Sequence, residues 1–140
     1  MTFINRLIII LIAFLIFEGC SFGKKIKDGE TAYERKQYSV AIEMLQKEYE
    51  QADNERKRGR TAYLLGMSYS YIEENSLSVD WLSKAVNNDY GNEALLKLAQ
   101  SYKKEGEYQA SIDTYNLLKN NSNNKRQIDR EIYVLREIAK

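Results

Sequence analysis

Apolar and polar residues follow two different patterns along the chain. Leu7 to Phe17 form an unbroken run of eleven apolar residues near the N-terminus. From residue 26 onward, apolar residues recur at the spacing of an amphipathic helix. The second pattern predicts an all-α protein. The expected helices span residues 26–36, 39–52, 56–74, 77–88, 92–105, 108–120 and 125–139.

Polar segments separate these predicted helices. Residues 87–92 read NNDYGN and residues 120–124 read NNSNN, and such clusters favour turns. Proline is absent and there are only 7 glycines, a composition that permits long helices. The last predicted helix carries one apolar stripe, which consists of Ile128, Ile132, Leu135 and Ile138. This helix either ends the helical array or begins further helix pairs.

A pair of small residues recurs three times. In each pair the second residue follows the first by twelve positions, and the first residues are 37 and then 33 positions apart. The pairs are Gly29 with Ala41, Gly66 with Ser78, and Ala99 with Ser111. Small residues let two helices approach closely where they cross. We therefore expect each pair to lie at the crossing of two consecutive antiparallel helices.

Bulky residues repeat in the same register and are expected to form the core around these crossings. Tyr69 and Tyr102 lie three positions after the first small residue of their repeats. Tyr38 and Tyr108 lie nine positions after it, and Leu45, Leu82 and Tyr115 lie sixteen positions after it. The middle repeat departs from the pattern, because Asn75 stands where an aromatic residue is expected. We expect Trp81 to supply bulk near that position. These core positions account for many of the eleven tyrosines.

The repeat length and the small residues resemble those of tetratricopeptide (TPR) repeats. The resemblance covers residues 28–122 and implies a right-handed superhelix of about three helix-turn-helix repeats, followed by a C-terminal capping helix at 123–140. The segment WLSKAVNNDYGNEALLKLAQSYKKEGEYQASIDTY is also similar to the N-terminal TPR region of certain Bacteroidetes outer-membrane lipoproteins. Some of those proteins belong to gliding-motility and type IX secretion machinery, and an OmpA-like domain follows their repeats.

The N-terminal apolar run is too short to cross a bilayer as a helix, which takes about 20 residues. With Arg6 before it, the run has the form of an export signal. Cys20, the only cysteine, follows Gly19 directly behind the run and resembles the lipobox of bacterial lipoproteins. The resemblance implies a signal peptide at 1–19, a lipid on Cys20, and a tether at 20–27.

Two features of the N-terminal segment bear on where the protein is located. Ser21 stands where an aspartate would retain a lipoprotein in the inner membrane, so the resemblance implies the outer membrane, with the protein facing the periplasm. Phe17 and Glu18 stand where a lipobox favours an aliphatic and a small residue. The alternative is a plain signal anchor in which Cys20 is incidental.

The composition argues against catalysis and against nucleic-acid binding. The chain has no histidine, which excludes a Ser-His-Asp triad and an imidazole-based metal site. It has no phosphate-binding GxxxxGK[ST] loop, and Glu73–Glu74 are interpreted as a solvated helix end. The net charge of +1 gives no basic field for nucleic acid. We expect a protein that is not an enzyme and uses no cofactor or metal.

Helical solenoids present an extended concave surface, which TPR proteins line with the first helix of each repeat. Here the resemblance implies a partner-binding groove formed by Tyr33, Arg60, Tyr63, Met67, Tyr71, Gln100 and Lys103. Tyr63 and Tyr71 have two interpretations, as anchors for a partner or as packing against a neighbouring repeat. The expected partner is an envelope protein or a peptide segment.

The predicted function is that of a non-catalytic scaffold in a bacterial envelope assembly. One alternative is a structural subunit that self-associates through the apolar stripe of residues 128–138. Another is the N-terminal part of a larger envelope protein, with an OmpA-like or enzymatic domain beyond residue 140.

Overall fold

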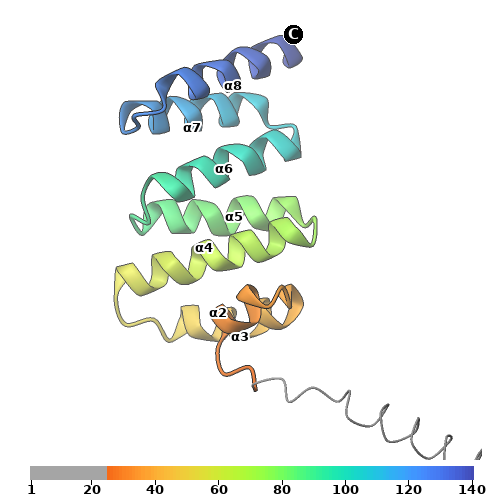
Figure 1. Cartoon of the computed structure of the whole chain (residues 1–140), viewed down its shortest axis with the longest axis vertical. Coiled ribbons are helices and arrows are strands. Elements are labelled where there is room, and N and C mark those ends of the chain that lie inside the picture. The colour runs from red at the N-terminus through yellow and green to blue at the C-terminus, as the bar shows by residue number, and fades with distance from the viewer. Residues whose placement is uncertain (1–24) are drawn as a thin grey trace, which may run out of the picture.

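The computed structural model describes residues 25–140, and within this range the chain is all-helical (Figure 1). The predicted all-α class is therefore confirmed for the described part of the chain. The seven helices are α2 (Gly29–Glu34), α3 (Tyr38–Glu50), α4 (Glu55–Tyr71), α5 (Asn75–Asn87), α6 (Asn92–Glu105), α7 (Tyr108–Asn120) and α8 (Lys125–Ile138). The predicted signal peptide at 1–19 and Cys20 lie outside the described residues. Between residues 25 and 140, no helix combines the length and the apolar composition that a membrane span requires.

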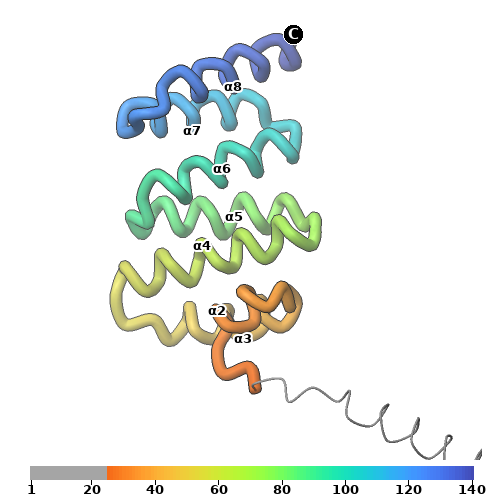
Figure 2. Tube along the Cα trace, in the orientation of Figure 1, coloured from red at the N-terminus to blue at the C-terminus, as the bar shows by residue number. Residues whose placement is uncertain are grey.

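The helices form a single stack in chain order. From α3 to α8 the chain reverses direction at every connection, so consecutive helices are antiparallel (Figure 2). Each helix packs against the next one, and α4 also contacts both α2 and α6. The stack is therefore held together by neighbours in the sequence, and α4 is enclosed by helices on several sides.

The predicted helix boundaries agree with the structure to within two residues, except at the start of α2 and at the end of α4. α2 is shorter than the predicted 26–36 because the Asp28 carboxylate caps it, accepting a hydrogen bond from the Thr31 amide at 2.7 Å. α4 ends at Tyr71 rather than at residue 74, because Glu73 adopts a left-handed conformation with a φ of 64°.

The turn between paired helices has the same geometry three times. Lys36, Glu73 and Gly106, each seven positions after a small repeat residue, have φ values of 59°, 64° and 81°. The amide after each one donates to a carbonyl five residues earlier: Gln37 to Ala32, Glu74 to Tyr69, and Glu107 to Tyr102, at 3.0, 3.0 and 2.9 Å. This bond satisfies a carbonyl that the helix end would leave unpaired. The three turns are thus structurally equivalent.

The six small repeat residues are buried. A Cβ atom at Gly29 would stand 2.5 Å from Leu45 Cγ, and one at Gly66 would stand 2.6 Å from Leu82 Cγ. The atoms that such a Cβ would meet first thus belong to the leucine sixteen positions after each glycine. In the third pair, the Ser111 hydroxyl donates to the Ala99 carbonyl at 2.8 Å.

The core consists of two apolar clusters, one spanning α2 to α6 and the other spanning α6 to α8. Leu45, Leu65, Leu82 and Leu135 are fully buried, and each contributes about 1.5–3 kcal/mol by burial. Trp81 is partly buried and packs against the first cluster. It meets Tyr49 of α3 edge-on, with ring centroids 5.0 Å apart, and Lys84 Nζ lies 3.8 Å from its ring centroid.

The apolar stripe of α8 is mostly covered within the chain. Ile128, Ile132 and Leu135 pack into the second cluster, whereas Ile138 is 51% exposed. A self-association surface made of the whole stripe is therefore inconsistent with the fold, because three of its four side chains already contact α6 and α7 residues.

Candidate partner-binding face

The predicted groove residues lie on three helices that alternate along the stack. Tyr33 belongs to α2, four of the residues belong to α4, and Gln100 and Lys103 belong to α6. Because α4 contacts both α2 and α6, these residues lie on neighbouring helices. We call the surface formed by α2, α4, α6 and α8 the binding face.

Tyr63 and Met67, the central groove residues, are almost fully buried, with 7% of each exposed. The Tyr63 ring stacks on Tyr90, with centroids 4.7 Å apart, and its hydroxyl donates to Glu93 Oε1 at 2.7 Å. Burial, together with this bond to a carboxylate, raises the pKa of Tyr63 above its ordinary value. Tyr63 therefore fits the packing interpretation, and its hydroxyl positions Glu93.

Tyr71, in contrast, keeps 53% of its surface exposed. Its ring stacks on Tyr38 at 4.5 Å, and Tyr33 lies 6.2 Å from Tyr71 and 5.9 Å from Tyr38. Burial, and secondly the proximity of Tyr71, raise the pKa of Tyr33 to about 12. The three rings form an aromatic cluster at the end of the binding face nearer the N-terminus. Sequence reasoning placed Tyr38 in the core and did not associate it with this cluster.

The two predicted cationic groove residues are engaged with neighbouring helices. Arg60 of α4 forms an ion pair with Glu30 of α2, and Lys103 of α6 pairs with Glu131 of α8 at 3.1 Å. All four side chains are about half exposed, so each pair contributes at most about 1 kcal/mol. The ion pairs link α2 to α4 and α6 to α8 on the binding face.

A first pocket, of about 170 Å³, lies between α4 and α6. It is lined by Met67, Ser70, Tyr71, Lys97, Gln100, Ser101 and Lys104. The structure thus brings three of the predicted groove residues together here: Met67, Tyr71 and Gln100. Lys104 Nζ donates to Ser70 Oγ at 3.1 Å across the two helices.

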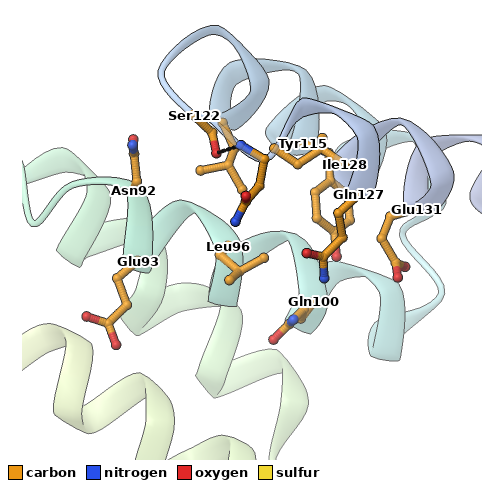
Figure 3. A pocket seen from close by; sticks show the side chains of 11 residues that line it. Asn92, Glu93, Leu96, Gln100, Tyr115, Ser122, Gln127, Ile128 and Glu131 are labelled. Atoms are coloured by element: carbon orange, nitrogen blue, oxygen red, sulfur yellow. Dashed lines mark hydrogen bonds between the residues drawn. The ribbon is translucent and has the colours of Figure 1, made fainter.

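A second and larger pocket, of about 290 Å³, lies between α6 and α8, with Tyr115 and Leu118 of α7 in its lining (Figure 3). We call it the α6–α8 pocket. Its lining consists of Asn92, Glu93, Leu96, Gln100, Tyr115, Leu118, Ser122, Asn124, Gln127, Ile128 and Glu131. Gln100 lines both pockets, so the two are adjacent along α6.

The repeat register predicts Glu93, Leu96 and Gln100 of α6 at groove-facing positions, but it associates no residue of α7 or α8 with this pocket. The repeat register contained a usable signal, since a step of 33 residues from Ala99 leads to Ile132 in α8. That step places α8 beside α6, where the first helix of a fourth repeat would lie, and so brings Glu131 to the binding face.

Within residues 25–140, no three His, Cys, Asp or Glu side chains come together in a group that could hold a metal ion. No family model matches the chain, and none of the curated proteins compared with it matches either. The functional interpretation therefore depends on the shape and charge of the binding face.

Proposed function

We propose that this protein is a lipid-anchored, non-catalytic scaffold of a bacterial envelope. In this proposal Cys20 carries the lipid and the binding face holds a segment of a partner protein. Residues 28–122 form three TPR-like repeats, α2–α3, α4–α5 and α6–α7, and α8 caps the third. The repeats wind into a right-handed superhelix.

The recurring turn supports the repeat assignment. The residues with positive φ and the following amide-to-carbonyl bonds occur at the same register after Gly29, Gly66 and Ala99. The contacts of Gly29 with Leu45 and of Gly66 with Leu82 repeat in the same way. Helix pairs with equivalent turns and equivalent close contacts stack on one another with a constant rotation. Repetition of that rotation produces a solenoid.

The adjacency of the two pockets is the observation that carries the binding proposal. Together they extend across α4, α6 and α8, and both combine apolar side chains with amide, hydroxyl and charged groups. A lining of that kind suits a polypeptide, which presents apolar side chains and backbone hydrogen-bonding groups along its length. The exposed Tyr71 adds an aromatic anchor at one end.

A lipid on Cys20 would hold the binding face close to the membrane. The predicted tether of residues 20–27 spans at most about 28 Å even when fully extended. The anchor is tested by the intact mass of the membrane-extracted protein, produced in a diderm bacterium beside a Cys20→Ser variant. A mature chain that begins at Cys20 and carries acyl mass, absent from the variant, supports it. An unmodified chain contradicts it.

The partner is tested by affinity purification from detergent-solubilised membranes of the host. Tyr71→Ala and Gln100→Arg change exposed residues of the binding face, and Tyr133→Ala is the matched control because Tyr133 is exposed on α8 and lines neither pocket. We expect one polypeptide to be recovered with the wild type and with Tyr133→Ala, but not with the other two variants. Equal recovery with all four proteins would contradict the proposal.

Self-association is a second candidate, favoured by a different observation. At the C-terminal end of the stack, four apolar side chains of α7 and α8 remain exposed: Leu117, Tyr133, Val134 and Ile138. Sedimentation of the wild type and of Val134→Asp over a wide concentration range distinguishes the two functions. A mass that rises with concentration in the wild type only would favour self-association.

A further inference from the structure

We propose that the α6–α8 pocket is a subsite for a lysine or arginine side chain of the partner segment. The inference rests on the proposed function and specifies the chemistry of one part of the partner. It follows from the charge of the pocket, from the way Glu93 is held, and from the apolar surface between its acidic residues.

The charged side chains of the pocket are both acidic. Glu93 and Glu131 contribute carboxylates, and no lysine or arginine is among the lining residues. Lys103, outside the lining, pairs with Glu131 through Oε2, and Oε1 of Glu131 has no hydrogen-bond partner among residues 25–140. The pocket therefore attracts a cation and repels a carboxylate.

Glu93 is positioned before any ligand arrives. The nearly buried Tyr63 donates its hydroxyl proton to Glu93 Oε1 at 2.7 Å, which restricts the rotation of an otherwise exposed carboxylate. Oε2 accepts no hydrogen bond from the described part of the chain. A carboxylate that is already oriented loses less conformational entropy when it binds an ammonium or guanidinium group.

Part of the pocket lining is apolar, and we call this part the floor. Leu96, Tyr115, Leu118 and Ile128 line it, and in the view of Figure 3 Leu96 lies between Glu93 and Glu131. Lysine and arginine combine a long alkyl stem with a charged head, so the stem can cover Leu96 while the head reaches a carboxylate. A purely apolar side chain would cover the floor but would desolvate the carboxylates without pairing them.

The neighbouring pocket has the opposite charge. Its lining contains Lys97 and Lys104 and no acidic residue. A basic side chain is therefore repelled from this first pocket, between α4 and α6, and is attracted to the α6–α8 pocket. The shared residue Gln100 separates the two environments.

The experiment is an NMR titration of the full-length protein in nonionic detergent, followed through its backbone amide shifts. The probes are the Nα-acetyl methylamides of lysine, norleucine and glutamate, which share a backbone and differ in the charge at the end of the side chain. We expect the lysine probe to shift the amides of residues 92–100 and 124–131 saturably. The norleucine probe should bind about five- to tenfold more weakly, the equivalent of about 1–1.4 kcal/mol, and the glutamate probe should give no saturable shift.

Three variants show whether the carboxylates are responsible. Glu93→Gln keeps an acceptor for Tyr63 but removes the charge, and Glu131→Gln removes the second charge. Glu105→Gln is the control, since it makes the same change at an exposed position of α6 that lines neither pocket. The first two variants should each weaken lysine binding several-fold, and the control should not.

Equal binding of the lysine and norleucine probes, or lysine shifts that map elsewhere and persist in Glu93→Gln and Glu131→Gln, would overturn the inference. That failure can be distinguished from failure of the proposed function. If affinity purification still recovers a partner that depends on Tyr71 and Gln100, only the subsite assignment is wrong. If it recovers none, the proposed function is wrong as well.

Discussion

The backbone of Gly66 lies so close to Leu82 that a Cβ atom at position 66 would stand 2.6 Å from Leu82 Cγ and 3.0 Å from the Leu82 amide nitrogen. Leu82 is fully buried, so a shift of its side chain would disturb the packing around it. The equivalent pair, Gly29 and Leu45, has nearly the same geometry. Close contact at this position is thus a recurring element of the helix pairs.

Gly66→Ala should therefore destabilise the protein, although alanine is the better helix former. Overpacking costs about 1–3 kcal/mol, and the gain in helix propensity offsets about 0.8–1 kcal/mol of that. We expect a net loss of about 1 kcal/mol in the free energy of unfolding, measured with urea. Leu82→Ala removes the nearest obstructing atom, Leu82 Cγ, and leaves the amide nitrogen in place. The substitution Gly66→Ala should therefore cost less free energy in the Leu82→Ala background than in the wild type. Strict additivity of the two changes would contradict the contact.

Glu73 and Gly106 occupy equivalent turns and should respond to substitution in opposite directions. Glu73→Gly relieves a left-handed conformation at a non-glycine residue and should stabilise the protein by about 0.5–1 kcal/mol. Gly106→Ala imposes that conformation on an alanine and should destabilise it by about 1 kcal/mol. A Cβ atom at Gly106 meets nothing within 4 Å, so the loss comes from the backbone alone. Thermal unfolding of both variants measures the two effects, and a change of the same sign in both would contradict the equivalence of the turns.

Stability should fall in alkaline solution. Burial raises the pKa of Tyr115 to about 12, with a smaller effect from Glu131, and burial and Tyr71 raise the pKa of Tyr33 to about 12. Below the ordinary tyrosine pKa of 10, both the folded and the unfolded chain keep these phenols neutral. Between pH 10 and about 12, the unfolded chain loses protons that the folded protein retains, so the free energy of unfolding decreases.

Urea unfolding at a series of pH values measures this dependence. Tyr115→Phe removes one of the titrating groups, and it should make the decrease above pH 10 shallower. A free energy of unfolding that stays constant up to pH 12 would contradict the burial of these phenols.

Ile132 and Ile138 lie on the same stripe of α8, but only Ile132 is covered, with 5% of it exposed against 51% of Ile138. Ile132→Asp should place a carboxylate in an apolar environment and lower the free energy of unfolding by about 3 kcal/mol or more. If α8 detaches from α7 instead, the loss is limited to the smaller free energy of that local unfolding. Ile138→Asp should change stability by less than about 0.5 kcal/mol. Amide hydrogen exchange localises the effect, and we expect lost protection in α7 and α8. Equal effects of the two substitutions would show that α8 does not pack as described.

The sequence predicted the number, order and approximate limits of the helices between residues 26 and 139, because apolar spacing and polar breaks are local features. It did not predict where α4 stops. The equivalent turn after α6 has Gly106 at its left-handed position, whereas α4 has Glu73 and α2 has Lys36. A left-handed residue that is not glycine leaves no signal in the composition.

The candidate site could be predicted only in part. The repeat register placed Tyr71 and Gln100 on a common surface, because residues at equivalent positions of stacked helices face the same side. The repeat register does not predict that Tyr63 stacks on Tyr90, because that contact joins α4 to the connection between α5 and α6. The α6–α8 pocket also depends on how α8 docks, which follows from tertiary packing rather than from a local pattern.

Site-specific photo-crosslinking in the host cells tests the central claim most directly. A photoreactive amino acid is placed at Gln100, which lines both pockets, and separately at Asn116, which is exposed on α7 and lines neither. The account predicts a crosslink from position 100 to one membrane-associated polypeptide, through a segment that contains lysine or arginine, and no such product from position 116. A crosslink of equal yield from both positions, or only to a second copy of this chain, would contradict it.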